Sequence, residues 1–153
     1  MTARRYALAA ALVATALALG ACSMMNSSSA PATAKPMMAP GDMAATLTAA
    51  AEVPPKASSG SGTAKVNLSG NTLTWTVTYS GMTGPVTAGH FHGPALPGAN
   101  AGVVVPLAGS LASPITGSAT LTDAQIADLK AGKWYINLHT AANPGGEIRG
   151  QVN

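Results

Sequence analysis

The chain has 153 residues, of which 8 are lysine or arginine and 5 are aspartate or glutamate. Apart from Arg4 and Arg5 near the N-terminus, the basic residues form no run or patch. Nucleic acid is therefore not an expected partner, because proteins that bind it carry clustered positive charge. The sequence contains one cysteine, which excludes an intramolecular disulfide.

The N-terminal residues have the pattern of an export signal. Arg4 and Arg5 precede an apolar run from Tyr6 to Leu19, which is shorter than the roughly 20 residues of a membrane-spanning helix. The run ends in small residues directly before Cys22, and this site resembles the lipobox of bacterial lipoproteins. We therefore expect a signal peptide over 1–21 and lipidation of Cys22; an ordinary signal peptide with an incidental cysteine is the alternative.

A lipid on Cys22 would hold the protein on the outer side of a membrane. In a Gram-negative bacterium, the serine that follows Cys22 implies sorting to the outer membrane. Residues 22–43 are rich in serine, alanine, proline and methionine and show no periodicity, so we expect a lipidated flexible tether. The methionines of this segment could be soft ligands for Cu(I), although an unstructured linker is the favoured explanation.

Residues 44–153 have the length of one small domain and predict an all-β fold. Within Thr72–Ser80, threonines alternate with apolar residues, as in a strand with one buried face. Thr122 and Gln125 form the capping box of one short helix, which ends at Gly132. Together these elements predict an antiparallel Greek-key β-sandwich with one short helix. The expected strands are Ala45–Ala50, Thr63–Leu68, Thr72–Ser80, Val86–His92, Gly102–Leu107, Ile115–Leu121, Trp134–Thr140 and Glu147–Val152.

The three histidines of the chain are the strongest chemical signal. His90 and His92 are two residues apart on one expected strand, so their side chains point to the same face. A second expected strand carries His139, and a hairpin would bring Glu147 beside it. Neutral imidazole binds Zn and Cu well, so the three histidines predict a copper or zinc site, with Glu147 as a fourth ligand or an orienting acceptor.

A structural network is the other interpretation of these residues, and the sequence favours it over a metal site. Asn137 shares a strand face with His139, and Arg149 shares one with Glu147. Such groups can satisfy one another through hydrogen bonds that hold loops together, and Glu147 with Arg149 could be a plain surface pair. The sequence leaves both hypotheses open. No other catalytic motif is present, because a Gly-x-Ser-x-Gly elbow and a phosphate-binding glycine loop are both absent.

Several segments resemble the CHRD (chordin) domain. The segments that carry this resemblance are Leu47–Pro55, Gly89–Ala95, Gly98–Val104, Thr122–Gln125, Gly132–Thr140 and Pro144–Gln151. The resemblance implies an all-β extracellular module without a general enzymatic activity. The His-x-His pair is also similar to Cu/Zn superoxide dismutase, but three histidines are too few for the paired metals of that family.

We therefore predict a lipid-anchored, non-enzymatic module of the cell envelope with a binding or structural role. Its partner would be an extracytoplasmic protein, a glycan or another ligand. The alternative is an exported copper- or zinc-binding protein that uses His90, His92 and His139, and copper or zinc is the only cofactor that the residues suggest.

Overall fold

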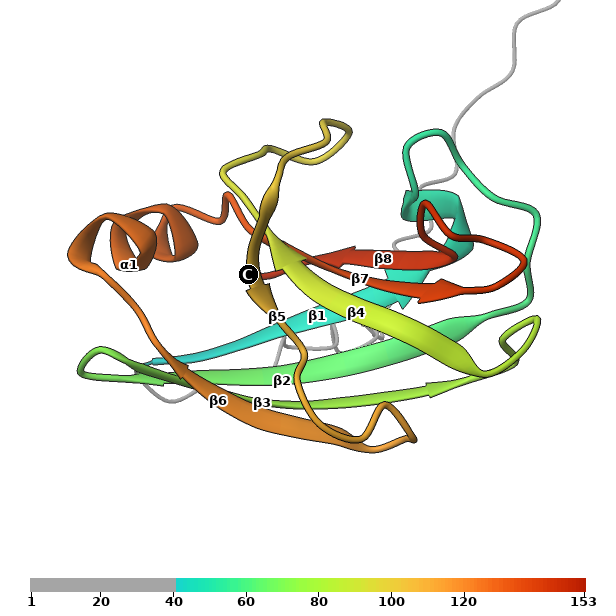
Figure 1. Ribbon diagram of the computed structural model, residues 1–153. Helices are drawn as coiled ribbons and strands as arrows, with labels where there is room; N and C mark the ends of the chain where they lie inside the picture. Colours follow the sequence, from blue (N-terminus) through green and yellow to red (C-terminus); the bar gives the residue numbers. More distant parts are fainter. Residues whose placement is uncertain (1–40) are drawn as a thin grey trace, which may run out of the picture. The chain divides into compact units, whose positions relative to one another are not determined.

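The computed structural model describes residues 41–153, which form an all-β domain with one short helix (Figure 1). The expected signal peptide, Cys22 and most of the expected tether lie outside the described residues. The 3-10 turn η1 spans Ala49–Ala51 and the helix α1 spans Asp123–Lys130. The strands are β1 (Asp42–Thr48), β2 (Ser61–Ser69), β3 (Thr72–Ser80), β4 (Val86–His92), β5 (Val103–Pro106), β6 (Ile115–Thr120), β7 (Tyr135–Thr140) and β8 (Ile148–Gln151).

The eight strands form one sheet in the order β5-β4-β7-β8-β1-β2-β3-β6, and every neighbouring pair is antiparallel. The sheet curls so that the half with β4, β5, β7 and β8 lies above the half with β1, β2, β3 and β6 (Figure 1). The antiparallel all-β prediction is confirmed. The two layers expected of a sandwich are halves of one continuous sheet, because β8 also pairs with β1.

The junction between β8 and β1 requires a very close approach of two backbones. A side chain at Gly150 would bring its Cβ within 2.4 Å of the Thr46 carbonyl oxygen. Glycine therefore lets the strands meet where the sheet turns from one half to the other. Ala44 and Asn153 exchange two backbone hydrogen bonds at 2.8 and 3.0 Å and extend this junction.

The hydrophobic core lies between the two halves. Trp75 of β3 meets Phe91 of β4 edge to face, with ring centroids 5.3 Å apart, and Phe91 also contacts Trp134. Both halves contribute fully buried aliphatic side chains, such as Val77 below and Ile136 above. Burial of these apolar surfaces is the main stabilising term for a domain without a disulfide.

The expected local patterns are present. In β3 the threonines are exposed and the apolar residues between them are buried or nearly so, as predicted. The capping box of Thr122 and Gln125 begins α1. Strand β1 begins at Asp42, so the last two residues of the expected tether belong to the sheet. No helix in residues 41–153 is long and apolar enough to cross a membrane.

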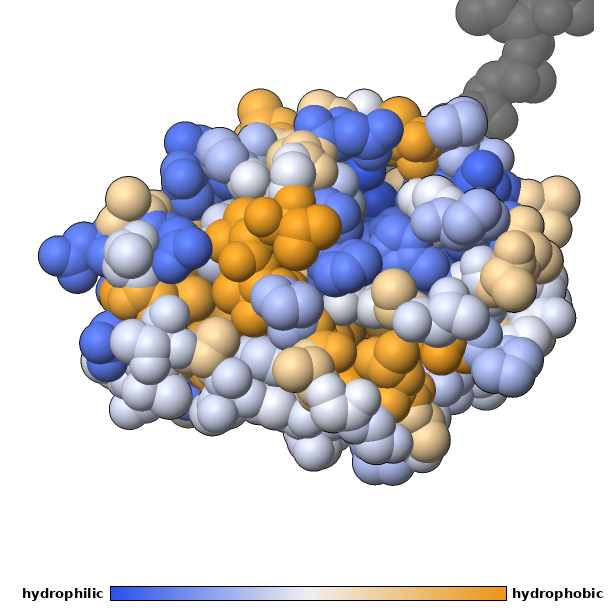
Figure 2. Space-filling model, in the orientation of Figure 1, coloured by the Kyte–Doolittle hydropathy of each residue, from blue (hydrophilic) through white to orange (hydrophobic). Residues whose placement is uncertain are grey.

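The outer face of the upper half is polar and is largely covered by loops. Figure 2 shows a hydrophilic area over β4 and β7 beside an apolar area over β5, where Val103 is 55% exposed. Asn137 and Arg149 lie on this face, and loops 50–58, 93–102 and 141–146 cover it so closely that both are buried. This covered polar face carries all three histidines.

Candidate metal centre

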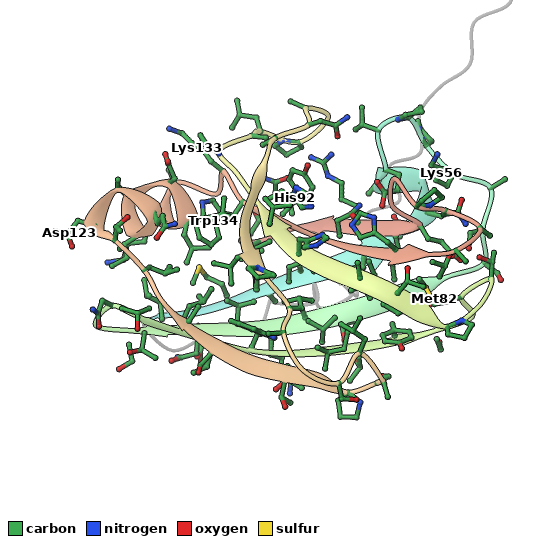
Figure 3. All side chains as sticks on the ribbon, viewed as in Figure 1. Lys56, Met82, His92, Asp123, Lys133 and Trp134 are labelled. Carbon is green, nitrogen blue, oxygen red and sulfur yellow. The ribbon has the colours of Figure 1, made fainter. Side chains whose placement is uncertain are left out.

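Strands β4 and β7 bring the three histidines together. Antiparallel pairing places His90 of β4 opposite Asn137 of β7. His139 lies two residues beyond Asn137 on the same face of β7, opposite Ala88. Phe91, between the two β4 histidines, points into the core and is fully buried. His90, His92 and His139 therefore project from the same outer face, and Figure 3 shows His92 beside the loop that follows β4.

The three imidazoles form a tight cluster. One ring nitrogen from each histidine lies within 4.8 Å of those of the other two, and all three side chains are half-buried. His90 Nδ1 lies 3.1 Å from His139 Nε2. The ring centroids of His90 are 5.5 Å from His92 and 5.0 Å from His139. The predicted grouping of the three histidines is therefore present in the structure.

In two of the three histidines, a backbone carbonyl group fixes which ring nitrogen carries the proton. His92 Nδ1 lies 3.0 Å from the Ala101 oxygen, and His139 Nδ1 lies 2.9 Å from the Pro144 oxygen. A carbonyl can only accept a hydrogen bond, so each Nδ1 donates its N–H. In a neutral ring the Nε2 then carries a free lone pair. His92 Nε2 is buried and has no hydrogen-bond partner.

The surroundings favour neutral rings. Burial lowers the pKa of His90, His92 and His139 below the usual value near 6.5. For His90 the neighbouring His139 and His92 lower the pKa further, since like charges repel. The hydrogen bond from His139 to Pro144 opposes the shift, but burial outweighs it. Neutral imidazole is the form that binds metal ions.

This geometry fits a transition metal ion. A tetrahedral ion with nitrogen ligands about 2.0–2.1 Å away needs nitrogens about 3.3 Å apart. His90 Nδ1 and His139 Nε2 are already at about this separation, and His92 would have to move inward to join them. His92 Nε2 and His139 Nε2 already have lone pairs, and His90 would bind through Nδ1 after its proton moves to Nε2. The hydrogen bonds from Nδ1 to backbone carbonyls are the supporting contacts that metal-bound histidines usually make.

Glu147 lies outside this cluster, contrary to its expected role as a fourth ligand. Its carboxylate is fully buried and accepts hydrogen bonds from donors on other segments. These donors are Ser58 Oγ at 2.6 Å, the Thr83 amide at 2.8 Å, Thr83 Oγ1 at 2.6 Å, Thr140 Oγ1 at 2.5 Å and Asn143 Nδ2 at 3.2 Å. The physical reason is that a buried carboxylate needs many donors, and the loops around it supply them.

The donors around Glu147 also control its charge. Burial by itself would raise the pKa of Glu147, but hydrogen bonds from Ser58, Thr140 and Thr83 outweigh it and lower the pKa to about 2. Glu147 is therefore an ionised anchor that ties loop 141–146 to residues far away in the sequence. It forms no pair with Arg149, and the salt bridge within residues 41–153 joins Lys133 and Asp128.

Arg149 and Tyr135 extend the site on the other side. The Tyr135 ring stacks on His92, with centroids 4.8 Å apart and planes 3° apart, and the Arg149 guanidinium lies 3.4 Å from the centre of the same ring. Arg149 also donates to Asn100 Oδ1 at 2.9 Å and to the Ala99 oxygen at 2.6 Å. Arg149 thus holds the loop that supplies the Ala101 carbonyl to His92.

Asn137 joins the histidine face to a second buried acid. Asn137 Nδ2 donates to Glu52 Oε1 at 2.6 Å, whereas Asn137 Oδ1 is buried without a partner. Burial raises the pKa of Glu52 to about 7, although the charge of Arg149 lowers it in part. At Gly146, where φ is +121°, a Cβ would lie 2.3 Å from Asn137 Nδ2, so glycine permits this close packing.

Sequence reasoning did not identify Tyr135 or Glu52 as parts of the site. Tyr135 could have been found, because it alternates with Asn137 and His139 on one strand face. Glu52 gave no signal, since it reaches Asn137 from a distant loop. The same holds for the carbonyl groups of Ala101 and Pro144, because any residue supplies a carbonyl.

The family model described as "CHRD domain" matches residues 43–152, which is more than half of the chain. No curated protein and no solved structure matches it.

Replacing Glu147 with glutamine tests its role as an anchor. A carboxyl group whose pKa falls from 4.5 to about 2 on folding stabilises the fold above pH 4.5, and this contribution is lost as the pH falls through 2. We expect Glu147→Gln to lower the free energy of unfolding at pH 7 by about 3 kcal/mol, and by much less at pH 2.5. Urea unfolding followed by tryptophan fluorescence measures both values.

The matched control is Asp123→Asn at the exposed start of α1, which should change stability by about 0.5 kcal/mol. An equal and small effect of both substitutions at pH 7 would contradict the role of Glu147.

Proposed function

Because this chain belongs to the CHRD domain family, we propose that it is a non-catalytic extracellular-type module that binds one copper or zinc ion through His90, His92 and His139. The observation that carries the proposal is the grouping of three ring nitrogens within 4.8 Å of one another. Copper and zinc are among the transition metal ions that imidazole ligands suit.

The hydrogen bonds around the cluster support metal binding over a purely structural role. A structural network would be expected to satisfy its buried nitrogens, because an unsatisfied buried group costs about 1–3 kcal/mol. His92 Nε2 has no partner, while its Nδ1 is held by Ala101. A bound ion would accept the free lone pair of His92 and would join it to His90 and His139.

The proposed role is to bind the ion rather than to catalyse a reaction. Among residues 41–153, the histidine cluster includes no carboxylate or thiol that could act as a general base or a nucleophile beside the ion. Glu147 is engaged elsewhere, as described above. A lipid on Cys22 would hold this metal-binding domain at the surface of a membrane in the cell envelope.

Metal titration tests the proposed site. Zn(II) and copper are titrated into the full chain carrying Cys22→Ser, which removes the only thiol. We expect one ion per chain with sub-micromolar affinity. Loss of a group that merely supports a ligand costs about 10–100-fold in affinity, so loss of a ligand in His92→Ala or His139→Ala should weaken binding by about 100-fold or more. Calorimetry gives the affinity, and elemental analysis gives the stoichiometry.

The matched control is a double variant of the expected tether that carries both Met37→Leu and Met38→Leu. It should leave the affinity for the metal ion unchanged. It separates the histidine site from the alternative of soft thioether ligands. If no ion binds stoichiometrically, and the histidine variants lose only stability, the histidines are structural.

The proposed anchor has its own test. In cells that express the chain, we expect the protein in the membrane fraction and a mass that includes the lipid on Cys22. Cys22→Ser should move the protein to the soluble exported fraction, because the lipid chains would supply the membrane affinity. Unchanged fractionation of Cys22→Ser, with no lipid in the mass spectrum of the original protein, would exclude the anchor.

A further inference from the structure

The ligand set of the proposed metal centre carries no negative charge. In the part of the chain that the structure describes, the cluster consists of three histidines and includes no aspartate, glutamate or cysteine. All three rings are half-buried, and histidine binds a metal ion as neutral imidazole, so the three ligands add no charge. An ion bound here keeps its full charge in a partly desolvated position, and the cost of such a position rises with the charge of the ion.

A fixed positive charge lies next to this set. Arg149 is on β8 and His92 is on β4, which flank β7 on opposite sides, so the Tyr135 ring of β7 lies between them. The guanidinium group is 3.4 Å from the centre of the Tyr135 ring, and that ring is stacked on His92. Arg149 is only 2% exposed, so solvent screens its charge weakly.

Among residues 41–153, no carboxylate forms a salt bridge with Arg149. Its donors bind the Ala99 carbonyl and the Asn100 amide oxygen, which are both uncharged. Glu52 is the buried acid on this side, but its pKa of about 7 leaves it largely protonated below neutral pH. Below neutral pH the metal centre therefore faces a cation that the surrounding residues do not cancel. Above neutral pH an ionised Glu52 offsets this charge in part, without a salt bridge to Arg149 among residues 41–153.

Resting on the proposed function, we propose that the site selects monovalent copper, Cu(I), over divalent ions, and that buried Arg149 is the residue that sets this selectivity. Repulsion from Arg149 is twice as large for a divalent ion as for a monovalent one, because it scales with the charge of the ion. Three neutral nitrogens can complete the coordination of Cu(I), whereas Zn(II) would add a fourth ligand such as water, so the discrimination between the two ions rests on charge.

The expected size of the effect follows from Coulomb's law. One unit of charge about 10 Å away, at an effective dielectric constant of about 20, changes a binding constant by roughly tenfold. Neutralising Arg149 should therefore strengthen Zn(II) binding by roughly tenfold more than Cu(I) binding. The ratio of the two affinities, and not either affinity alone, reports the charge of Arg149.

The experiment measures both affinities at pH 8 in the full chain carrying Cys22→Ser. The affinity for Cu(I) is measured by competition with a coloured Cu(I) chelator, with ascorbate present and oxygen excluded to keep the copper reduced. The affinity for Zn(II) is measured by competition with a zinc indicator. We expect Arg149→Met to lower the ratio of Cu(I) affinity to Zn(II) affinity by about tenfold. Arg149→Lys, which keeps the charge but not the planar stack, should preserve the ratio within about threefold.

The selectivity proposal is overturned if the ratio of Cu(I) affinity to Zn(II) affinity is unchanged in folded Arg149→Met. It is also overturned if Arg149→Lys changes the ratio as much as Arg149→Met does. Neither outcome contradicts the metal site itself. A chain that binds neither ion overturns the proposed function itself. If Arg149→Met does not fold, Glu52→Gln decides the question, because the amide oxygen can still accept from Asn137. Removing this carboxylate at pH 8 should shift the ratio toward Cu(I), and an unchanged ratio would again overturn the proposal.

Discussion

The backbone carbonyls of Ala101 and Pro144 determine the chemistry of the histidine cluster. Each accepts the Nδ1–H of one ring, from His92 or His139, and so leaves the Nε2 of that ring unprotonated. Without these two contacts the rings could rotate or change tautomer, and the cluster would present N–H groups instead of ligand atoms. The candidate site therefore depends on the two loops that supply the carbonyls.

The rest of the domain holds those loops in place. Arg149 binds loop 93–102 through Ala99 and Asn100, and Asn100 Nδ2 donates to the Val53 oxygen. Glu147 holds loop 141–146 through Asn143 and Thr140 and joins it to Ser58 and Thr83. Both charged groups are buried, so each requires its hydrogen-bond partners, and the polar face becomes a rigid support for the histidines.

The sequence predicted the parts of this account that depend on local periodicity. Alternation identified the faces of β3, the shared face of His90 and His92, and the face of His139, because side chains alternate along any strand. It did not predict that Glu147 lies away from His139, since its position depends on donors from Ser58 and Thr83, far away in the sequence. It also could not show that the sandwich layers are one sheet, because the β8–β1 pairing joins the two ends of the domain.

The central claim is that His92 and His139 present unprotonated Nε2 atoms to one common point beside His90, and NMR tests it directly. Long-range ¹H–¹⁵N correlation spectra of metal-free protein at pH 7.5 report which ring nitrogen carries each proton. The account predicts that His92 and His139 are protonated on Nδ1 and bare on Nε2, and that both Nε2 signals shift when one equivalent of Zn(II) is added. Rings protonated on Nε2, or on both nitrogens, would contradict it.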